Sequence, residues 1–123
     1  MKMLHFKDSE FACKHCGKLP VNGMNPVLLA KLDHLRTLVE APIIVTSGYR
    51  CPVHNRNEGG VSNSQHVLGT AADITCRYMT PSKLAEKARQ LGFDGIGVYP
   101  KSNFVHVDCR SNGEEPCEYN WTE

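Results

Sequence analysis

Two segments of the chain begin with a capping residue followed by proline, and they constrain the fold more than any other feature. The first covers residues 26–40, with Asn25 as its cap and apolar side chains at helical spacing, namely Leu28, Leu32, Leu35 and Val39. The second covers residues 81–91, with Thr80 as its cap and Gly92 directly after it. Because proline suits the first helical turn and glycine ends helices, both segments are predicted to be amphipathic helices.

Four short runs rich in β-branched and aromatic residues lie between and after these helices. They cover residues 42–49, 70–75, 95–99 and 104–108. Runs of this length and composition are typical of strands. The sequence therefore predicts an α+β fold in which a small antiparallel sheet is flanked by two main helices.

The chain is expected to form a single domain over residues 1–123. It is too short for two ordinary cores, and it has no repeat and no internal linker. Residues 1–24 are expected to form an N-terminal segment, and residues 111–123 an irregular tail, because the tail shows no helical or strand period. Residues 51–64 are polar and contain two adjacent glycines, which predicts a functional loop.

Charge and hydropathy exclude two classes of partner. Lys and Arg number 14 against 13 Asp and Glu, so the formal charge of +1 provides no basic surface for nucleic acid. No apolar run approaches the roughly 20 residues that cross a bilayer, so membrane insertion is not expected. The N-terminus lacks the apolar stretch of a signal peptide, which predicts a cytoplasmic chain as synthesised, although removal of a secretory segment would leave the same sequence. We expect a monomer.

The run FVHVD at residues 104–108 places unlike side chains on its two faces. In an extended strand Phe104, His106 and Asp108 point one way, while the two valines point the other. If the valines face the core, His106 and Asp108 face a cleft. Taken alone, the run fits an edge strand with an exposed histidine better than it fits a functional site.

A second stretch, NSQHVLGTAADITC at residues 63–76, has His66 and Asp73 on either side of a glycine. By itself this pair fits a buried histidine beside a capping aspartate. Together with His106 it supplies two imidazoles and one carboxylate, which zinc accepts as ligands at about 2.0 to 2.2 Å. Three protein ligands leave a fourth position for water, so the sequence predicts a catalytic zinc site.

The same stretch carries a wider motif, S-x-H-x-x-G-x-A-x-D, formed by Ser64, His66, Gly69, Ala71 and Asp73. With the downstream strand that holds His106, it closely resembles the D-alanyl-D-alanine metallopeptidase branch of the lysostaphin, carboxypeptidase and sonic hedgehog superfamily. Three blocks extend the resemblance over most of residues 26–110, namely TSGYRCPVHN, GGVSNSQHVLGTAADI and GIGVYPKSNFVHVD.

The resemblance implies a hedgehog/D-Ala-D-Ala peptidase-like fold and a zinc-dependent peptidase. Such an enzyme would hydrolyse peptide bonds in peptidoglycan stem peptides or their cross-links, as a carboxypeptidase or an endopeptidase, after release or export of the chain. His66, Asp73 and His106 match the family's zinc ligands. Arg50 matches its substrate-binding arginine, whose guanidinium suits a carboxylate or a developing oxyanion; an ordinary ion pair is the alternative. Ser64 would bind substrate backbone or merely shape a turn.

One position departs from the family pattern. Many members have a catalytic Asp or Glu three residues before the last histidine ligand, where this chain has Asn103, and an amide cannot serve as that base. Asp108 is then expected either to act as the base, beside Arg50 as a second catalytic residue, or to orient a zinc-bound histidine; a plain surface charge is the remaining option. The departure also leaves open a catalytically weak or inactive zinc-containing module that binds cell-wall peptides.

A second group of metal-type residues lies outside this motif. Cys13 and Cys16 form a C-x-x-C knuckle before a glycine, and Cys51 and His54 form a C-x-x-H pair. Together they are candidates for a second, structural zinc site that pins the N-terminal segment. A disulfide between Cys13 and Cys16, or reduced thiols, would explain the same residues. A zinc-knuckle nucleic-acid binder does not fit the near-neutral charge.

Overall fold

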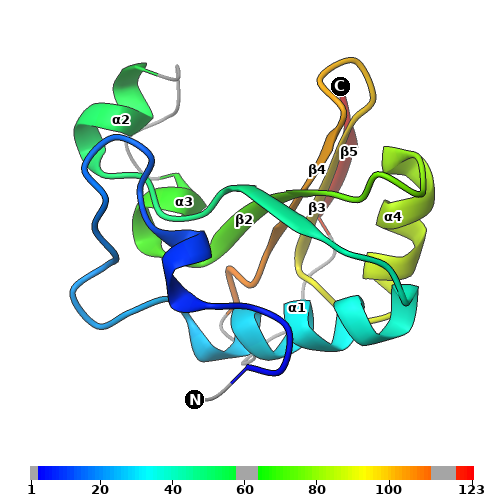
Figure 1. Ribbon diagram of the computed structural model, residues 1–123. Helices are drawn as coiled ribbons and strands as arrows, with labels where there is room; N and C mark the ends of the chain where they lie inside the picture. The colour runs from blue at the N-terminus through cyan, green and yellow to red at the C-terminus, as the bar shows by residue number, and fades with distance from the viewer. Residues whose placement is uncertain (1–2, 58–63, 112–118) are drawn as a thin grey trace.

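The computed structural model describes residues 3–57, 64–111 and 119–123, without the side chains of His54 and Tyr119. The first helical element is a short 3-10 helix, η1. Helices and strands then follow in the order shown in Figure 1. The elements are η1 (Asp8–Phe11), α1 (Pro26–Val39), β1 (Ile44–Ser47), α2 (Pro52–Asn57), α3 (Gln65–Leu68), β2 (Ala71–Thr75), α4 (Pro81–Arg89), β3 (Gly95–Tyr99), β4 (Phe104–Asp108) and β5 (Tyr119–Thr122).

Both predicted main helices are confirmed, and their caps explain where they begin. The Asn25 side chain accepts hydrogen bonds from the backbone N–H groups of Val27 and Leu28 at the start of α1. The Thr80 side chain accepts from the backbone N–H of Lys83 at the start of α4. These bonds satisfy donors that a first helical turn leaves unpaired. Helix α4 ends two residues earlier than predicted.

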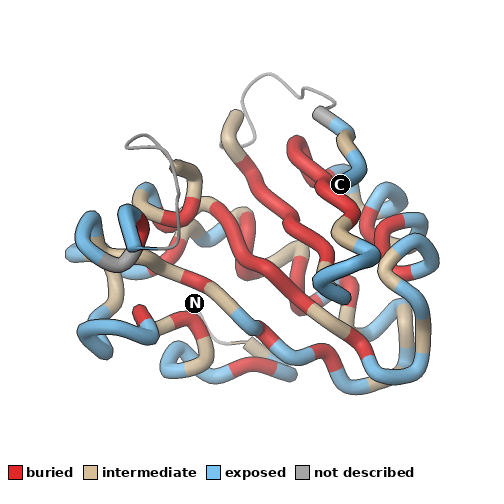
Figure 2. The backbone as a smooth tube through the Cα atoms, turned by 90° about the horizontal axis from the view of Figure 1, so that it is seen from above, coloured by how far each residue is buried: buried red, intermediate tan, exposed pale blue. Residues whose placement is uncertain are grey.

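A five-stranded sheet has the order β1-β2-β4-β3-β5. The four predicted strands are confirmed, and neighbouring pairs among them are antiparallel. The side chains of β4 alternate between the two faces of the sheet, as its valine pattern predicts. Val105 and Val107 point into the hydrophobic core, and His106 lies on the opposite face. Buried residues follow these central strands in Figure 2. The α+β prediction is therefore correct.

The C-terminal tail corrects one prediction. Residues 111–123 were expected to be irregular, but Tyr119–Thr122 form β5, which pairs in parallel with β3 at the sheet edge. Gly97 of β3 lies opposite Trp121 in this register. A Cβ atom on Gly97 would collide with the Trp121 indole, so the missing side chain makes room for the ring. The run YNWT does alternate aromatic and polar residues, but four such residues after a polar stretch are a weak strand signal.

The hydrophobic core lies between the helices and one face of the sheet. Inward side chains of α1 and α4 pack with those of the strands in one cluster, which includes Leu28, Leu32, Ile74, Leu84, Ile96 and Val105. The N-terminal segment belongs to this cluster as well, because Phe6 and Phe11 are buried in it. Packing therefore anchors this segment independently of any metal. In the described part of the chain, no helix is long and apolar enough to cross a membrane.

The segment predicted as a loop over residues 51–64 is partly helical. Helix α2 occupies Pro52–Asn57, beginning with proline at its first position. Residues 58–63 lie outside the described structure. Helix α3 then begins directly after this segment, at Gln65.

Candidate active site

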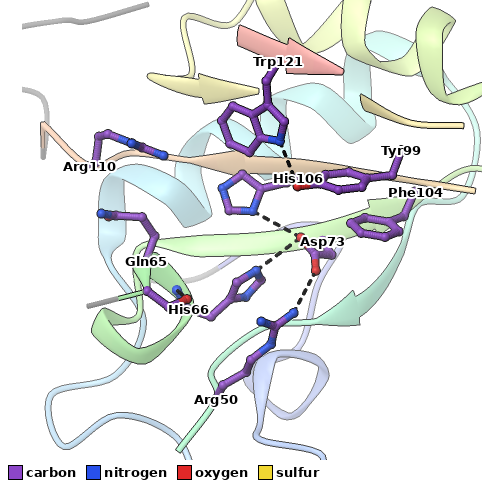
Figure 3. Close-up of a pocket in the computed structure, with 10 residues that line it drawn as sticks. Arg50, Gln65, His66, Asp73, Tyr99, Phe104, His106, Arg110 and Trp121 are labelled. Atoms are coloured by element: carbon purple, nitrogen blue, oxygen red, sulfur yellow. Dashed lines mark hydrogen bonds and ion pairs between the residues drawn. The ribbon is translucent and has the colours of Figure 1, made fainter. Parts of the chain in front are cut away.

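Three side chains predicted as zinc ligands meet on the face of the sheet opposite the core. His66 comes from α3, Asp73 from β2 and His106 from β4 (Figure 3). The Asp73 Oδ1 atom lies 3.2 Å from His66 Nε2 and 3.3 Å from His106 Nδ1. One donor atom from each residue lies within 4.8 Å of the other two. The fold thus brings together three residues that are separated in sequence by 7 positions (His66 to Asp73) and 33 positions (Asp73 to His106).

Backbone pairing explains how the donors come together. Asp73 and His106 are direct partners in the antiparallel register of β2 and β4, so their side chains lie on the same face. His66 reaches them from one short helical turn. The Ser64 hydroxyl accepts the His66 backbone N–H at the start of α3, and Gly69 ends the helix with a φ of +76°, a value that glycine adopts without strain.

The outer nitrogen of each imidazole has its own partner. His66 Nδ1 lies 2.8 Å from the carbonyl oxygen of Gly48, to which it donates as the N–H tautomer. His106 Nε2 lies 2.7 Å from Asp108 Oδ2. With the outer nitrogens engaged, the inner nitrogens, His66 Nε2 and His106 Nδ1, both face Asp73 Oδ1. This arrangement fixes ring orientation and is the usual environment of metal-bound histidines.

Asp108 lies behind His106, away from the group of donors. Its side chain is fully buried, and it accepts hydrogen bonds from Arg110 Nε at 2.9 Å and from a terminal guanidinium nitrogen at 2.7 Å. Burial raises the Asp108 pKa, but the hydrogen bonds from Arg110 and His106 outweigh burial and hold it far below its usual value. A Cβ atom on Gly95, its strand partner, would collide with the carboxylate.

This placement separates the roles expected for Asp108. Its contact with the outer nitrogen of His106 fits the role of orienting that ring. The role of general base does not fit, because the carboxylate is absent from the cavity lining and faces the wrong side of the imidazole. A plain surface charge is also wrong, since the residue is buried.

Arg50 contacts the other oxygen of the shared carboxylate. Its terminal guanidinium nitrogen lies 3.2 Å from Asp73 Oδ2, and its Nε donates to the Ser47 hydroxyl at 3.1 Å. Burial raises the Asp73 pKa, but hydrogen bonds from His106 and His66 outweigh it and lower the pKa to about 2. Asp73 is therefore ionised at neutral pH, as a metal ligand must be.

A cavity of about 500 Å³ opens over the three donors. Arg50 and Ser64 line it, as do five residues that the sequence did not single out as site residues: Gln65, Tyr99, Phe104, Arg110 and Trp121. The Tyr99 and Phe104 rings are stacked with centroids 4.4 Å apart, and Trp121 Nε1 donates to the Tyr99 hydroxyl at 2.8 Å. Figure 3 shows this aromatic wall on the side of the donors opposite Arg50.

A sequence signal existed for some of these residues. Arg110 continues the alternation of Phe104, His106 and Asp108, so it belongs on the same face by the same argument. Trp121 had no such signal, because it enters the site only through the pairing of β5 with β3.

Asn103, at the family's usual base position, lies in the turn before β4 with a φ of +58°. It does not line the cavity. Among the described residues, Asp73 is the only carboxylate that does.

The second predicted group is brought together in part. The thiols of Cys13, Cys16 and Cys51 lie within 4.8 Å of one another. His54 lies in α2, but its side chain is outside the described structure. A different imidazole is close by: His15 Nδ1 lies 3.5 Å from Cys51 Sγ.

Comparisons with known proteins agree with this geometry. Residues 4–108 match the model of the family described as peptidase M15. The probable peptidoglycan L,D-endopeptidase MepK of Haemophilus influenzae is 35% identical over 96 residues, which cover 72% of this chain and 52% of that protein. The peptidoglycan L,D-endopeptidase MepK of Escherichia coli K12 is 32% identical over 95 residues, with the same two coverages.

A third relative carries zinc in its name. The zinc D-Ala-D-Ala carboxypeptidase of Streptomyces albus G is 39% identical over 85 residues, covering 66% of this chain and 33% of that protein. The chain thus spans about half the length of the two MepK proteins and a third of the carboxypeptidase. Because the family model matches most of its residues, the chain belongs to the peptidase M15 family.

Proposed function

We propose that this protein is a zinc-dependent peptidase that hydrolyses peptide bonds in peptidoglycan stem peptides or their cross-links. The observation that carries the proposal is the convergence of His66, Asp73 and His106 beneath an open cavity. The names of the relatives support both the substrate and the metal, since two are peptidoglycan endopeptidases and one is a zinc carboxypeptidase. The substrate lies outside the cytoplasmic membrane, so the proposal includes release or export of the chain.

The donor set fits zinc. Two imidazole nitrogens and one ionised carboxylate oxygen are among its preferred ligands, and His66 Nε2, His106 Nδ1 and Asp73 Oδ1 would hold it. A zinc ion bound there would lower the pKa of a coordinated water and polarise the scissile carbonyl. Gly48 and Asp108 serve as positioning partners, because they fix the outer nitrogens of the two rings.

Substrate binding is assigned to the cavity walls. Arg50 on one side and Arg110 on the other provide positive charge, which suits the carboxylates of stem peptides. The aromatic wall of Tyr99, Phe104 and Trp121 offers apolar surface for the peptide. Ser64 already caps α3 through its hydroxyl, so a backbone contact to substrate would add to that structural role.

Asn103 favours a second candidate function. Among the described residues, no carboxylate besides Asp73 lines the cavity, so the usual base is missing at its family position. A zinc-containing module that binds cell-wall peptides with weak or no catalysis is therefore the alternative. It keeps the metal site and the cavity but predicts no turnover.

The test is incubation with purified, defined muropeptides followed by mass spectrometry. We expect cleavage that a chelator abolishes and zinc restores, and that His66→Ala removes. The exposed His34→Ala serves as the matched control and should retain activity. Loss of a terminal D-alanine identifies a carboxypeptidase, and splitting of a cross-linked dimer identifies an endopeptidase. Binding of the muropeptide without any cleavage would contradict the peptidase and favour the binding module.

A further inference from the structure

The cysteines outside the active site form a compact group of their own. Cys13 and Cys16 lie in the turn that follows η1, and Cys51 lies between β1 and α2. Although Cys51 is 38 residues from Cys13 in sequence, all three thiol sulfurs lie within 4.8 Å of one another. Cys76 and Cys109 are buried in the hydrophobic core instead. Folding therefore brings these three cysteines together, whereas Cys76 and Cys109 stay separate from them.

The backbone shapes the first two thiols into a knuckle. The N–H of Gly17 donates to the Cys13 carbonyl and the N–H of Cys13 to the Lys18 carbonyl, both at 2.8 Å. Gly17 has a φ of +74°, which allows the chain to reverse directly after Cys16. The N–H of Cys51 donates to Cys13 Sγ at 3.4 Å, a contact that favours the thiolate form of Cys13.

A fourth donor is present beside the thiols. His15 Nδ1 lies 3.5 Å from Cys51 Sγ. Sulfurs that share one zinc at about 2.3 Å lie roughly 3.8 Å apart in a tetrahedral arrangement, so the observed spacing needs little adjustment. Three cysteines with one histidine are a common closed ligand set for structural zinc.

We propose that Cys13, Cys16, Cys51 and His15 bind a second, structural zinc ion. This assignment replaces His54 with His15 as the nitrogen ligand. A disulfide explains the group less well, because it would pair two thiols and leave the third beside them, whereas a metal uses all three. No disulfide links any of the five cysteines in the described part of the chain.

This site would join the N-terminal segment to the chain that sets the active site. Next to the group, the Tyr49 N–H donates to the Phe11 carbonyl at 2.8 Å, and a Cβ on Gly48 would approach that oxygen to 2.6 Å. One residue further, the Arg50 N–H donates to the His66 carbonyl at 3.2 Å. The carbonyl of Gly48 holds the His66 ring. The second metal thus acts as a clamp on the segment that positions a catalytic ligand.

The direct test is cobalt substitution in His66→Ala, which leaves the proposed thiol site intact. Cobalt takes the same ligands as zinc, and sulfur ligation produces charge-transfer absorption in the near ultraviolet. We expect this absorption in the parent and in His66→Ala, and its loss in Cys16→Ser and Cys51→Ser. The control Cys76→Ala removes a cysteine outside the group and should keep the absorption.

The outcomes separate this proposal from the proposed peptidase. Absence of sulfur-to-cobalt absorption in both the parent and His66→Ala would overturn the second site, whether or not the enzyme cleaves muropeptides. A Cys13 to Cys16 disulfide in the mass of the unreduced protein would also overturn it. Inactivity towards muropeptides with the absorption intact would contradict the peptidase alone. These measurements on the parent and His66→Ala do not depend on the folding of the cysteine variants.

Two further variants test the ligand assignment and the clamp. His15→Ala should shift the cobalt spectrum, whereas His54→Ala should not; the reverse result would overturn the choice of His15. Removal of the thiol-bound metal should accelerate hydrogen exchange at the Tyr49 amide, which bonds to Phe11. The Leu84 amide in the first turn of α4 donates to the carbonyl of the capping residue Thr80. It is the internal control, and its exchange rate should not change.

Discussion

The two groups of metal-type side chains differ in what holds them in place. His66, Asp73 and His106 are 4%, 5% and 9% exposed, and two of them are opposite residues in a strand ladder. The thiol group lies on turns, and Cys16 is exposed. Hydrogen bonds to Gly48 and Asp108 fix the first group, whereas the second contains contacts between its own members, from the Cys51 N–H to Cys13 Sγ and between Cys51 Sγ and His15 Nδ1.

The two groups correspond to two different kinds of proposed metal site in one small fold. Nitrogen and oxygen donors on two strands and one helical turn, below a cavity, leave room for water and substrate. Sulfur donors on turns surround an ion from several sides and join distant segments of chain. We expect the first group to keep its geometry without metal, and the second to lose it.

Removing a ligand from the sheet has the largest expected effect. His106→Ala should lower muropeptide hydrolysis by roughly a thousandfold or more, because the metal contributes several kcal/mol of transition-state stabilisation. The thiol-site absorption of cobalt should persist in this variant. The exposed His34→Ala provides the comparison, and equal losses in both variants would contradict a specific role for the sheet-bound donors.

Asp108→Asn leaves the three proposed metal ligands in place and changes only the hydrogen-bond partner of His106 Nε2. An amide in place of the carboxylate weakens the hold on the outer nitrogen of His106, so zinc affinity at the active site should fall by about 10- to 100-fold. Competition with a chromophoric chelator measures this affinity. Asp8→Asn, an exposed carboxylate in η1, is the matched control. Unchanged affinity in Asp108→Asn would remove Asp108 from the account.

Gly97→Ala tests how β5 completes the cavity wall. The added Cβ would collide with the Trp121 ring and should cost about 1 to 3 kcal/mol of unfolding free energy. In a Trp121→Ala background the same change should cost much less, because the colliding ring is gone. Denaturant unfolding of the four proteins gives the coupling. Additive costs would show that the two residues do not contact each other in solution.

Thr80→Ala, at the start of α4, has the smallest expected effect on stability. It serves as a baseline because Thr80 belongs to neither metal group. Loss of the α4 cap should lower the free energy of unfolding by about 1 kcal/mol, with metal content and hydrolysis unchanged. Ser82→Ala removes a hydroxyl in the same turn that is exposed and should have little effect. If Thr80→Ala also lost metal, the separation of fold stability from site geometry would be wrong.

Much of the fold could be predicted because its signals are local. Asn25 and Thr80 cap helices through bonds within their own turns, and the alternation in β4 follows from the strand period. The grouping of His66, Asp73 and His106 was also predictable, since the motif pointed to the first two and the strand pattern to the third.

The remainder depends on contacts between distant segments. Strand β5 pairs with β3 where Gly97 leaves room for Trp121, and no local pattern encodes that pairing. The role of Asp108 required its buried contact with Arg110 and the outer side of His106. His15 was not among the predicted ligands, because C-x-x-H at Cys51 gave a stronger sequence signal than a histidine inside the knuckle.

An anomalous-difference map recorded at the zinc absorption edge would test the account most directly. The crystals should be grown from protein purified without added metal. The account predicts one peak between His66 Nε2, Asp73 Oδ1 and His106 Nδ1, and a second among the three thiols. A map with no peak at the sheet donors would contradict the central claim that they form the zinc site of a peptidase.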